Sequence, residues 1–418
     1  MGCKRHVGAA PAKMKDMEAS LYLHIPFCAG SCDYCDFHSI PVKPADPRLD
    51  IYVDRLLADA RQAFSGAVAG GCDAVTSVPT IYIGGGTPSM LGLRRLKRLL
   101  AGLAVLAPNI PLEWTVEANP ESADGAFFET CAATGVTRVS LGVQTFYEPS
   151  RAAVNRVGEA RILRERLDLA HSFFPAAFSV DLIAGLPFQD EAVLQADIAQ
   201  ALAFEPAHVS LYSLMVDEHT PLWNKWKKWE KARRFDCDVE RIDRLWLAGR
   251  DELERNGYVQ YEVSNFCRKE EASEISEKNM SAHNLRYWRM KNWLGIGSAA
   301  SGTIIDDVTG TGVRRTVPAD VDAYLTRPAV VVERLDRSVL IKETFLMGFR
   351  TMFGPDETLF CKRFHTDIES CIPKTIALWK NRRLLDQERL RLTHAGLLFL
   401  DAFLREAFSE LDCGNGAG

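Results

Sequence analysis

The feature that most constrains the fold is an alternation of short, β-rich apolar runs with amphipathic stretches between residues 20 and 265. This alternation is typical of repeated βα units around a parallel sheet. Six such units predict an α/β fold, a partial (β/α)6 barrel of the TIM type. The predicted strands are Leu21–Pro26, Thr80–Ile83, Glu113–Glu117, Arg138–Val143, Phe178–Ile183 and His208–Leu214, and the predicted helices cover 50–66, 92–106, 123–134, 159–173, 190–203 and 239–256.

The rest of the chain suggests how the domains are divided. A charged stretch over 265–282 is expected to be a solvated loop, and a glycine-rich segment follows from Trp288 to Gly302. The segment RLRLTHAGLLFLDAFLREAF, from Arg389, predicts a strand followed by a helix, as in a winged-helix module. The predicted divisions are a tail over 1–19, the barrel and its C-terminal extension over 20–302, a connector over 303–337, a small and mainly helical C-terminal domain over 338–410, and a tail over 411–418.

Composition excludes several classes of protein. A net charge of −5 gives no overall basic field that would attract nucleic acid, so a DNA-binding role for the last segment is disfavoured despite its arginines. No apolar run approaches the roughly 20 residues that span a bilayer. The first residues lack the apolar core of a secretory signal, so we expect a cytoplasmic protein. In that compartment the 11 cysteines favour metal or redox chemistry over disulfides.

Three cysteines stand in a C-x3-C-x2-C array directly after the first predicted strand: Cys28, Cys32 and Cys35. Three thiolates from one loop can ligate three irons of a [4Fe–4S] cubane and leave the fourth iron open, whereas electron-transfer clusters usually have four cysteine ligands. A zinc site is the alternative, with His24 and His38 nearby, but structural zinc normally uses four ligands in recognisable pairs. The spacing and the strand context favour the cluster.

Polar and glycine-rich segments follow the other strands. A GGGTP turn comes after the second strand, where glycines let the backbone approach a ligand closely. Glu117 and Gln144 end the third and fourth strands, and Arg156 lies just beyond. Asp181 lies inside an apolar strand, where a charge is costly unless it is paired or bound to a ligand. Because functional residues of βα barrels lie at the C-terminal ends of the strands, we expect these groups to share one mouth.

The motifs HIPFC, YCDF, GGGTPS, EANP, GVQTF and HN-x2-YW resemble those of the radical S-adenosylmethionine (SAM) family that contains the oxygen-independent coproporphyrinogen III oxidases and the HemW-type haem chaperones. The resemblance covers about residues 20–302, and 338–410 more weakly. It implies a [4Fe–4S] cluster on the three cysteines, an electron from flavodoxin or ferredoxin, and cleavage of SAM to methionine and a 5′-deoxyadenosyl radical. The SAM contacts that it implies are Tyr22, Tyr34, Gly85, Gly86, Thr87, Glu117, Gln144, Arg156 and Asp181.

Within that family, two functions stay open. The oxidases continue the cluster motif to a fourth cysteine, and this chain has Phe37 there, which favours the chaperone. The HN-x2-YW motif implies haem binding through His283, Asn284, Tyr287 and Trp288, because imidazole is a common axial ligand and aromatic rings offer flat apolar surface. We therefore expect a haem chaperone that serves haem proteins of respiration, with coproporphyrinogen III oxidation as the alternative. Peripheral membrane contact and a monomeric or dimeric state both stay open.

Overall fold

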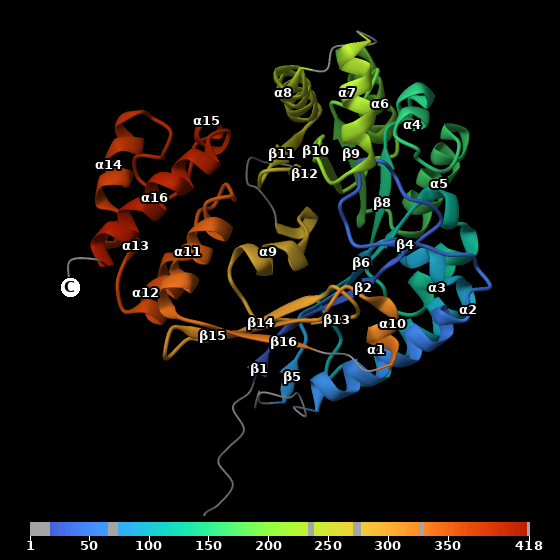
Figure 1. Cartoon of the computed structure of the whole chain (residues 1–418), viewed down its shortest axis with the longest axis horizontal. Helices are drawn as coiled ribbons and strands as arrows, with labels where there is room; N and C mark the ends of the chain where they lie inside the picture. The colour runs from blue at the N-terminus through green and yellow to red at the C-terminus, as the bar shows by residue number, and fades with distance from the viewer. Residues whose placement is uncertain (1–16, 66–73, 233–237, 271–276, 327–329, 416–418) are drawn as a thin grey trace, which may run out of the picture.

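The computed structural model describes residues 17–65, 74–232, 238–270, 277–326 and 330–415 (Figure 1). Its centre is a run of six parallel strands that are neighbours in the order in which they occur along the chain. All six strands predicted from the sequence are confirmed. They are β2 (Ser20–Ile25), β6 (Thr80–Gly85), β7 (Glu113–Ala118), β8 (Arg138–Gln144), β9 (Phe178–Ala184) and β10 (His208–Ser213).

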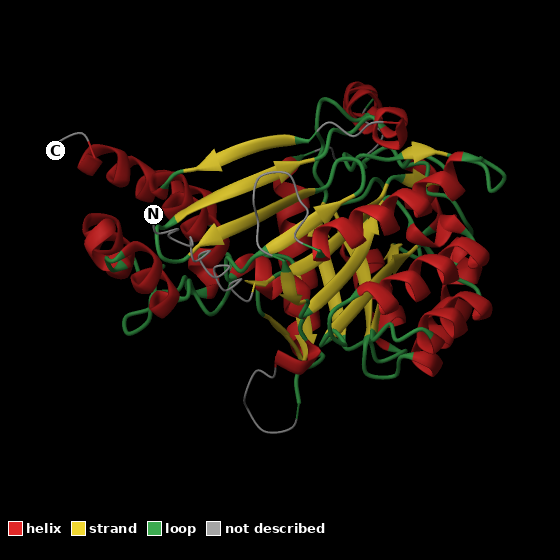
Figure 2. Ribbon diagram, turned by 90° about the horizontal axis from the view of Figure 1, so that it is seen from below, coloured by secondary structure: helices red, strands yellow, loops and turns green. Residues whose placement is uncertain are grey.

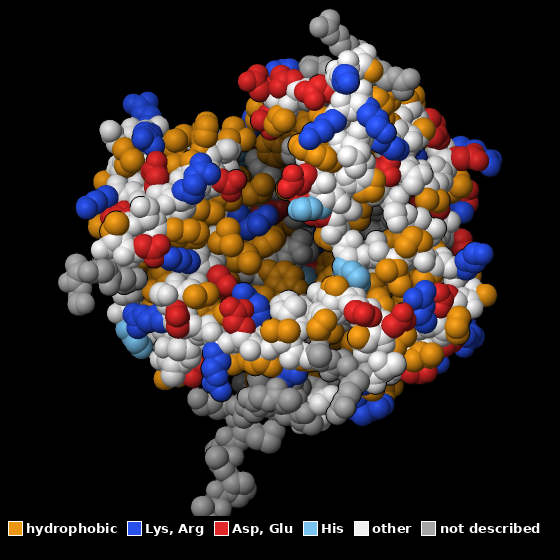
Figure 3. Space-filling model, in the orientation of Figure 1, with side chains coloured by type: hydrophobic (Ala, Val, Ile, Leu, Met, Phe, Trp, Pro, Cys, Tyr) orange, Lys and Arg blue, Asp and Glu red, His pale blue; other side chains and the backbone are white. Residues whose placement is uncertain are grey.

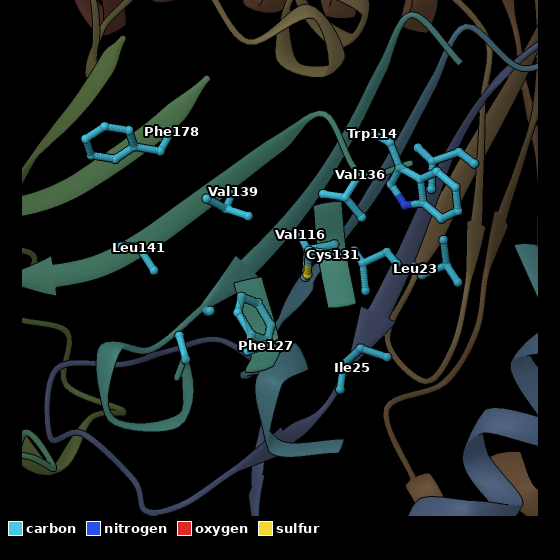
Figure 4. Close-up of a cluster of buried hydrophobic side chains, with 14 of the residues drawn as sticks. Leu23, Ile25, Trp114, Val116, Phe127, Cys131, Val136, Val139, Leu141 and Phe178 are labelled. Carbon is cyan, nitrogen blue, oxygen red and sulfur yellow. The ribbon is translucent and has the colours of Figure 1, made fainter. Parts of the chain in front are cut away.

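Six helices follow these strands and cover their outer face, as Figure 2 shows on the side away from the C-terminal helices. They match the predicted helices and are α1 (Arg48–Phe64), α2 (Leu93–Leu106), α3 (Gly125–Ala133), α5 (Ala160–Phe173), α6 (Glu191–Leu202) and α8 (Val239–Arg255). Buried residues recur at helical spacing, as in α2, where Leu96, Leu99, Leu100 and Leu103 face the sheet. Figure 4 shows this core between strands and α3, with Leu23, Val116 and Val139 on strands beside Phe127 and Cys131.

Further strands extend the sheet on both sides, and within the described residues its two ends are not paired with each other, so the barrel is open. Strands β12 (Asn265–Arg268) and β11 (Tyr258–Gln260) follow β10, both in antiparallel pairing. On the other side β13 (Trp293–Ile296) runs parallel to β2. Three antiparallel strands continue the sheet from there, namely β14 (Ser301–Asp306), β15 (Thr311–Thr316) and β16 (Val331–Leu335).

Two expectations about local structure were wrong. The charged stretch 265–282 does not begin as a loop, because Asn265–Arg268 forms β12 and its first three residues are buried. The charges begin only at Arg268, and residues 271–276 lie outside the described part of the chain. The strand expected near Arg389 is reduced to one antiparallel bridge between Leu385 and Leu392. In both places the run of apolar residues was too short to distinguish a strand from a loop or a helix.

The C-terminal helices have a core of their own, around Phe345, Phe349, Trp379 and Phe403. Met290, in the turn between α9 and β13, and Ile305 and Leu335 of the sheet extension pack into the same core, which joins the helices to the barrel. Segment 303–337, which we expected to be a connector, contains β15, β16 and α10 (Val321–Thr326). The helices are α11 (Arg337–Gly348), α12 (Glu357–Phe364), α13 (Ile368–Cys371), α14 (Pro373–Asn381), α15 (His394–Leu397) and α16 (Leu400–Asn415).

A hollow bordered by hydrophobic side chains separates the C-terminal helices from the barrel on the face seen in Figure 3. Helix α9 (Ala282–Trp288) lies between these two parts of the molecule in the same orientation (Figure 1). Along the described chain, none of the helices is both long and apolar enough to cross a membrane.

Candidate functional site

The cysteine loop is closed at its base by two short paired strands. Strand β3 (Phe27–Cys28) pairs with β4 (Ile40–Pro41), and the amide of Val42 donates to the carbonyl of Cys28 over 3.0 Å. Cys28, Cys32 and Cys35 are all half-buried and carry free thiols. The loop is therefore held at both ends while its three sulfurs remain available as ligands.

Helix α7 (Pro221–Lys231) holds the middle of the loop. The amide of Asp33 donates to the carbonyl of Val154 over 2.9 Å, and the carbonyl of Asp33 accepts from the amide of Leu222 over 2.9 Å. The Asp33 carboxylate also forms an ion pair with Lys225. These contacts fix the backbone between Cys32 and Cys35 without using a cysteine sulfur.

Two side chains from the segments that follow β6 and β8 approach the cysteine sulfurs. The Thr87 hydroxyl lies 3.4 Å from Cys28 Sγ, and Arg156 Nη1 donates to Cys32 Sγ over 3.6 Å. Asn119 connects the two, because its Nδ2 donates to Thr87 Oγ1 over 3.0 Å and its Oδ1 accepts from Arg156 Nη2 over 2.8 Å. A guanidinium and a hydroxyl therefore lie beside two of the three sulfurs, where each can donate a hydrogen bond to a cysteine that ligates iron.

The donor set fits a cubane better than a zinc ion. Both ring nitrogens of His24 are engaged, Nδ1 with the Tyr22 hydroxyl and Nε2 with the carbonyl of His38, each at 2.9 Å. Within the described ranges, no three His, Cys, Asp or Glu side chains converge as ligands of one metal ion would. A cubane needs no such convergence, because each thiolate binds a different iron.

The glycine run after β6 lies against its neighbours too closely for side chains. A Cβ on Gly85, whose φ is +109°, would lie 2.6 Å from the His24 ring. A Cβ on Gly84 would lie 2.8 Å from the Glu117 carboxyl group, and one on Gly86 would lie 2.9 Å from the carbonyl of Ile25. The run therefore needs glycines for close packing, and two of its amides are engaged within the protein: that of Gly85 donates to Glu117 over 3.1 Å and that of Gly86 to the carbonyl of Ile25 over 2.8 Å.

Two carboxyl groups lie inside the barrel beside the glycine run. Glu117 accepts from the Tyr82 hydroxyl over 2.5 Å and from the amide of Gly85 over 3.1 Å. Asp181 accepts from the Ser140 hydroxyl over 3.3 Å. Burial raises the pKa of Glu117 to about 7, helped by the nearby charge of Asp181, and burial raises the pKa of Asp181 to about 6. Both groups can thus change charge near neutral pH.

The remaining predicted SAM contacts border the same mouth. The rings of Tyr22 and Tyr82 are 6.2 Å apart. Gln144 has a φ of +69° at a bulge of β8, and its amide lies near Gly142, whose carbonyl accepts from Arg156 over 2.5 Å. Tyr34 packs against the apolar cluster that contains Leu186 and Trp226. Prediction from the sequence missed Asn119 and Tyr82, although Asn119 lies within the EANP motif that carried the resemblance.

The predicted haem residues lie apart from this mouth, on α9. His283 is only 1% exposed, and its ring nitrogens face the hydroxyls of Thr80 at 2.8 Å and Tyr287 at 2.9 Å. Its ring stacks on that of Tyr82 at 5.0 Å, and burial lowers the pKa of His283 to about 3. An iron ligand needs a free imidazole nitrogen, and this arrangement occupies both.

The other two residues of the haem motif are more accessible. Asn284 is half-buried near the N-terminus of α9, where its backbone N–H donates to Ser281 Oγ over 3.3 Å. Trp288 is half-buried with the Arg350 guanidinium 4.0 Å above its ring, and its buried Nε1 has no hydrogen-bond partner among the described residues. Arg350 is in turn paired with the buried Glu262 over 3.4 Å.

The resemblance implies that Glu117 contacts SAM, and this predicts how SAM affinity depends on pH. An ionised Glu117 accepts hydrogen bonds more strongly than a protonated one, and the group becomes protonated as the pH falls through about 7. We expect affinity to fall in that range, and Glu117→Gln to bind more weakly with a flatter profile between pH 6.5 and 8. Equilibrium dialysis with labelled SAM measures this. The exposed Glu129→Gln should keep the wild-type profile, and a wild-type profile in Glu117→Gln would contradict the assignment.

Comparison with known proteins places the chain among characterised relatives. Residues 22–199 match the model of the radical SAM superfamily. The "heme chaperone HemW" of Lactococcus lactis is 32% identical over 90% of this chain and 94% of that protein. The protein of the same name from Escherichia coli is 33% identical over 68% of this chain and 70% of its own length.

A mitochondrial relative and a solved structure complete the comparison. The radical S-adenosyl methionine domain-containing protein 1 of Bos taurus is 30% identical over 94% of this chain and 88% of its own. The coproporphyrinogen III oxidase HemN of Escherichia coli has a similar fold, with a TM-score of 0.72 over 95% of this chain and 90% of that one. At 19% identity this likeness concerns the fold alone.

Proposed function

Since the chain belongs to the HemW heme chaperone family of the radical SAM superfamily, we propose that it binds a [4Fe–4S] cluster, SAM and haem, and that it passes haem to recipient haem proteins. The observation that best supports the cofactor part is the chain of contacts from Cys28 through Thr87, Asn119 and Arg156 to Cys32. It brings the cysteine loop, the glycine turn and two further strand ends to one mouth.

The proposed roles follow from the chemistry of each group. Cys28, Cys32 and Cys35 would hold three irons, and Thr87 and Arg156 would lower the energy of the thiolates by donating to them. When bound, the cluster supplies an electron to the sulfonium of SAM. The turn at Gly85, Gly86 and Thr87 would receive the amino group of SAM through acceptor oxygens, since the amides of Gly85 and Gly86 already donate to Glu117 and Ile25. Glu117 and Asp181 would accept hydrogen bonds from its ribose or ammonium group.

Coproporphyrinogen III oxidation is the second candidate, because the cluster loop and the glycine turn resemble those of the oxidases as well as those of the chaperones. Against it stands Phe37, at the position where the oxidases have a fourth cysteine. Its side chain is 68% exposed, so it neither fills the core nor offers a ligand to iron. We therefore place haem transfer first.

One anaerobic experiment separates the two functions. Reconstituted protein is titrated with haem by absorbance and mixed with an apo haem protein, while a parallel sample receives SAM, a reductant and coproporphyrinogen III. A chaperone takes up about one equivalent of haem, releases it to the acceptor and forms no protoporphyrinogen. Protoporphyrinogen formation without stoichiometric haem uptake would identify an oxidase.

The contacts of His283 lead to a prediction about stability. We propose that His283 fixes α9 to β6, because its ring contacts the hydroxyl of Thr80 on β6. His283→Ala would leave the hydroxyls of Thr80 and Tyr287 without this partner and would open a cavity. A loss of about 2–4 kcal/mol in the free energy of unfolding is expected from such a buried change. Urea unfolding measures it, with the exposed His219→Ala as the control that should cost almost nothing.

The same variant addresses the haem ligand. At a temperature where His283→Ala is folded, haem affinity should match that of the wild type if His283 is structural. A loss of haem affinity together with unchanged unfolding would instead make His283 an iron ligand and contradict the structural role.

A further inference from the structure

A cavity of about 420 Å³ lies away from the cysteine loop, between the extension of the sheet and the helices that flank it. Leu294 and Ile296 of β13, Ile304 of β14, Val313 of β15 and Val332 of β16 form its apolar wall. Helices α1 and α10 contact each other, and α1 also contacts β13, so these helices bound the opposite side. The volume lies in the range of small-molecule sites, which are mostly apolar with a few polar groups.

The cavity and the proposed SAM site lie on opposite faces of the sheet. Strand β13 pairs in parallel with β2, with Leu294 beside Leu21, Gly295 beside Tyr22 and Ile296 beside Leu23. Because successive side chains of a strand point to opposite faces, Leu21 and Leu23 pack outward while Tyr22 faces the barrel interior. A molecule in the cavity would therefore be separated from SAM by the thickness of one sheet.

One end of the cavity is polar and carries a buried donor that lacks a partner. Arg55 Nη2 is 2.9 Å from Asp59 Oδ1, and the Tyr324 hydroxyl donates to Asp59 Oδ2 over 2.6 Å. Arg55 Nε is buried and has no hydrogen-bond partner among the described residues. Arg315 also lines the cavity. The polar end thus holds Arg55, whose Nη2 is paired with Asp59 while its Nε meets no acceptor among the described residues.

We propose that this cavity binds an apolar molecule that bears a carboxylate, with its body against the aliphatic wall and its carboxylate at Arg55. Removing the apolar body from water drives the binding, and the guanidinium supplies a charge-assisted hydrogen bond that fixes orientation. Haem with its propionates and a fatty acid share this chemistry. If the ligand is haem, the cavity is the cargo site of the proposed chaperone, and the inference then depends on that function.

The strand register provides a matched pair of variants. Val332 lines the cavity, shares its face with its register partner Arg315, and is 50% exposed at the rim. Its neighbour Val331 is 60% exposed and is not part of the lining. A tryptophan is therefore tolerated at either position, but only Val332→Trp places the new ring in the cavity. Thermal unfolding and the iron–sulfur absorbance of both reconstituted variants check that the fold is retained.

The experiment titrates the full chain with haem, followed by difference absorbance, and separately with dodecanoate, followed by calorimetry. For at least one ligand we expect near-stoichiometric binding to wild type and Val331→Trp, and at least tenfold weaker binding to Val332→Trp. Arg55→Gln should weaken binding about tenfold, since it removes the charge-assisted contact. Binding of neither ligand, or equal binding by the two tryptophan variants, would overturn the cavity proposal.

The same titrations separate this inference from the proposed function. Haem binding that is equal in the two tryptophan variants would leave a haem chaperone with its cargo site elsewhere. Dodecanoate binding that is lost in Val332→Trp, in a protein that takes up no haem, would establish the cavity as a fatty-acid site and refute the chaperone.

Discussion

Replacing Cys32 by alanine is expected to abolish the iron–sulfur absorbance of anaerobically reconstituted protein. A cubane with one open iron needs three thiolates, so the loss of Cys32 leaves a second iron without a protein ligand. Cys32 Sγ also accepts a hydrogen bond from Arg156, so the variant would leave this guanidinium without that acceptor. The iron–sulfur absorbance and the iron content of the reconstituted protein measure the effect.

The control for that loss is Cys361→Ala on α12, because Cys361 is an exposed free thiol far along the chain from the loop. Its cluster content should equal that of the wild type. A wild-type spectrum in Cys32→Ala would contradict the assignment of the loop as the cluster site.

A second large effect is expected for Gly85→Ala. The new Cβ would lie 2.6 Å from the His24 ring at a φ of +109°, so both the contact and the backbone conformation oppose it. Relief requires movement of the turn or of His24, which also supports Tyr22 through a 2.9 Å hydrogen bond. We expect SAM binding to fall at least about 100-fold, the equivalent of roughly 2.7 kcal/mol, when measured by equilibrium dialysis.

Gly92→Ala separates the steric contact from the backbone strain. Gly92 also has a positive φ, of +73°, but a Cβ there meets nothing within 4 Å. This variant should lose some stability through strain while keeping SAM affinity. Equal losses of SAM affinity in both variants would show that the contact with His24 is not what positions the turn.

The parallel strands were predictable because each is a short apolar run bounded by an amphipathic helix. The strands of the extension were not, since segments such as Thr311–Thr316 are mostly polar and none of their residues is fully buried. Pairing across the sheet, rather than local pattern, decides their structure. β12 is similar, because it forms by pairing with β10 and β11, and Cys267 is buried against Tyr261, Met280 and Leu285.

The candidate site was predictable where a motif carries its own chemistry, as the three cysteines do. It was not where a residue acts through partners distant in the sequence. Asn119 belongs to the site because it forms hydrogen bonds with Thr87 and Arg156. His283 contacts Thr80 over 2.8 Å, although the two residues are 203 positions apart in the sequence. The cavity behind β13 could not be predicted for the same reason, since its apolar wall and Arg55 come from opposite halves of the chain.

The central claim is that the cysteine loop holds a cluster with one open iron and that SAM binds to that iron. Electron paramagnetic resonance of the reduced, reconstituted protein with and without SAM tests it directly. We predict the signal of one [4Fe–4S]⁺ cluster per chain and a clear change in its g-values when SAM is added. A reduced cluster whose spectrum is indifferent to saturating SAM, or a protein that binds no cluster at all, would contradict the account.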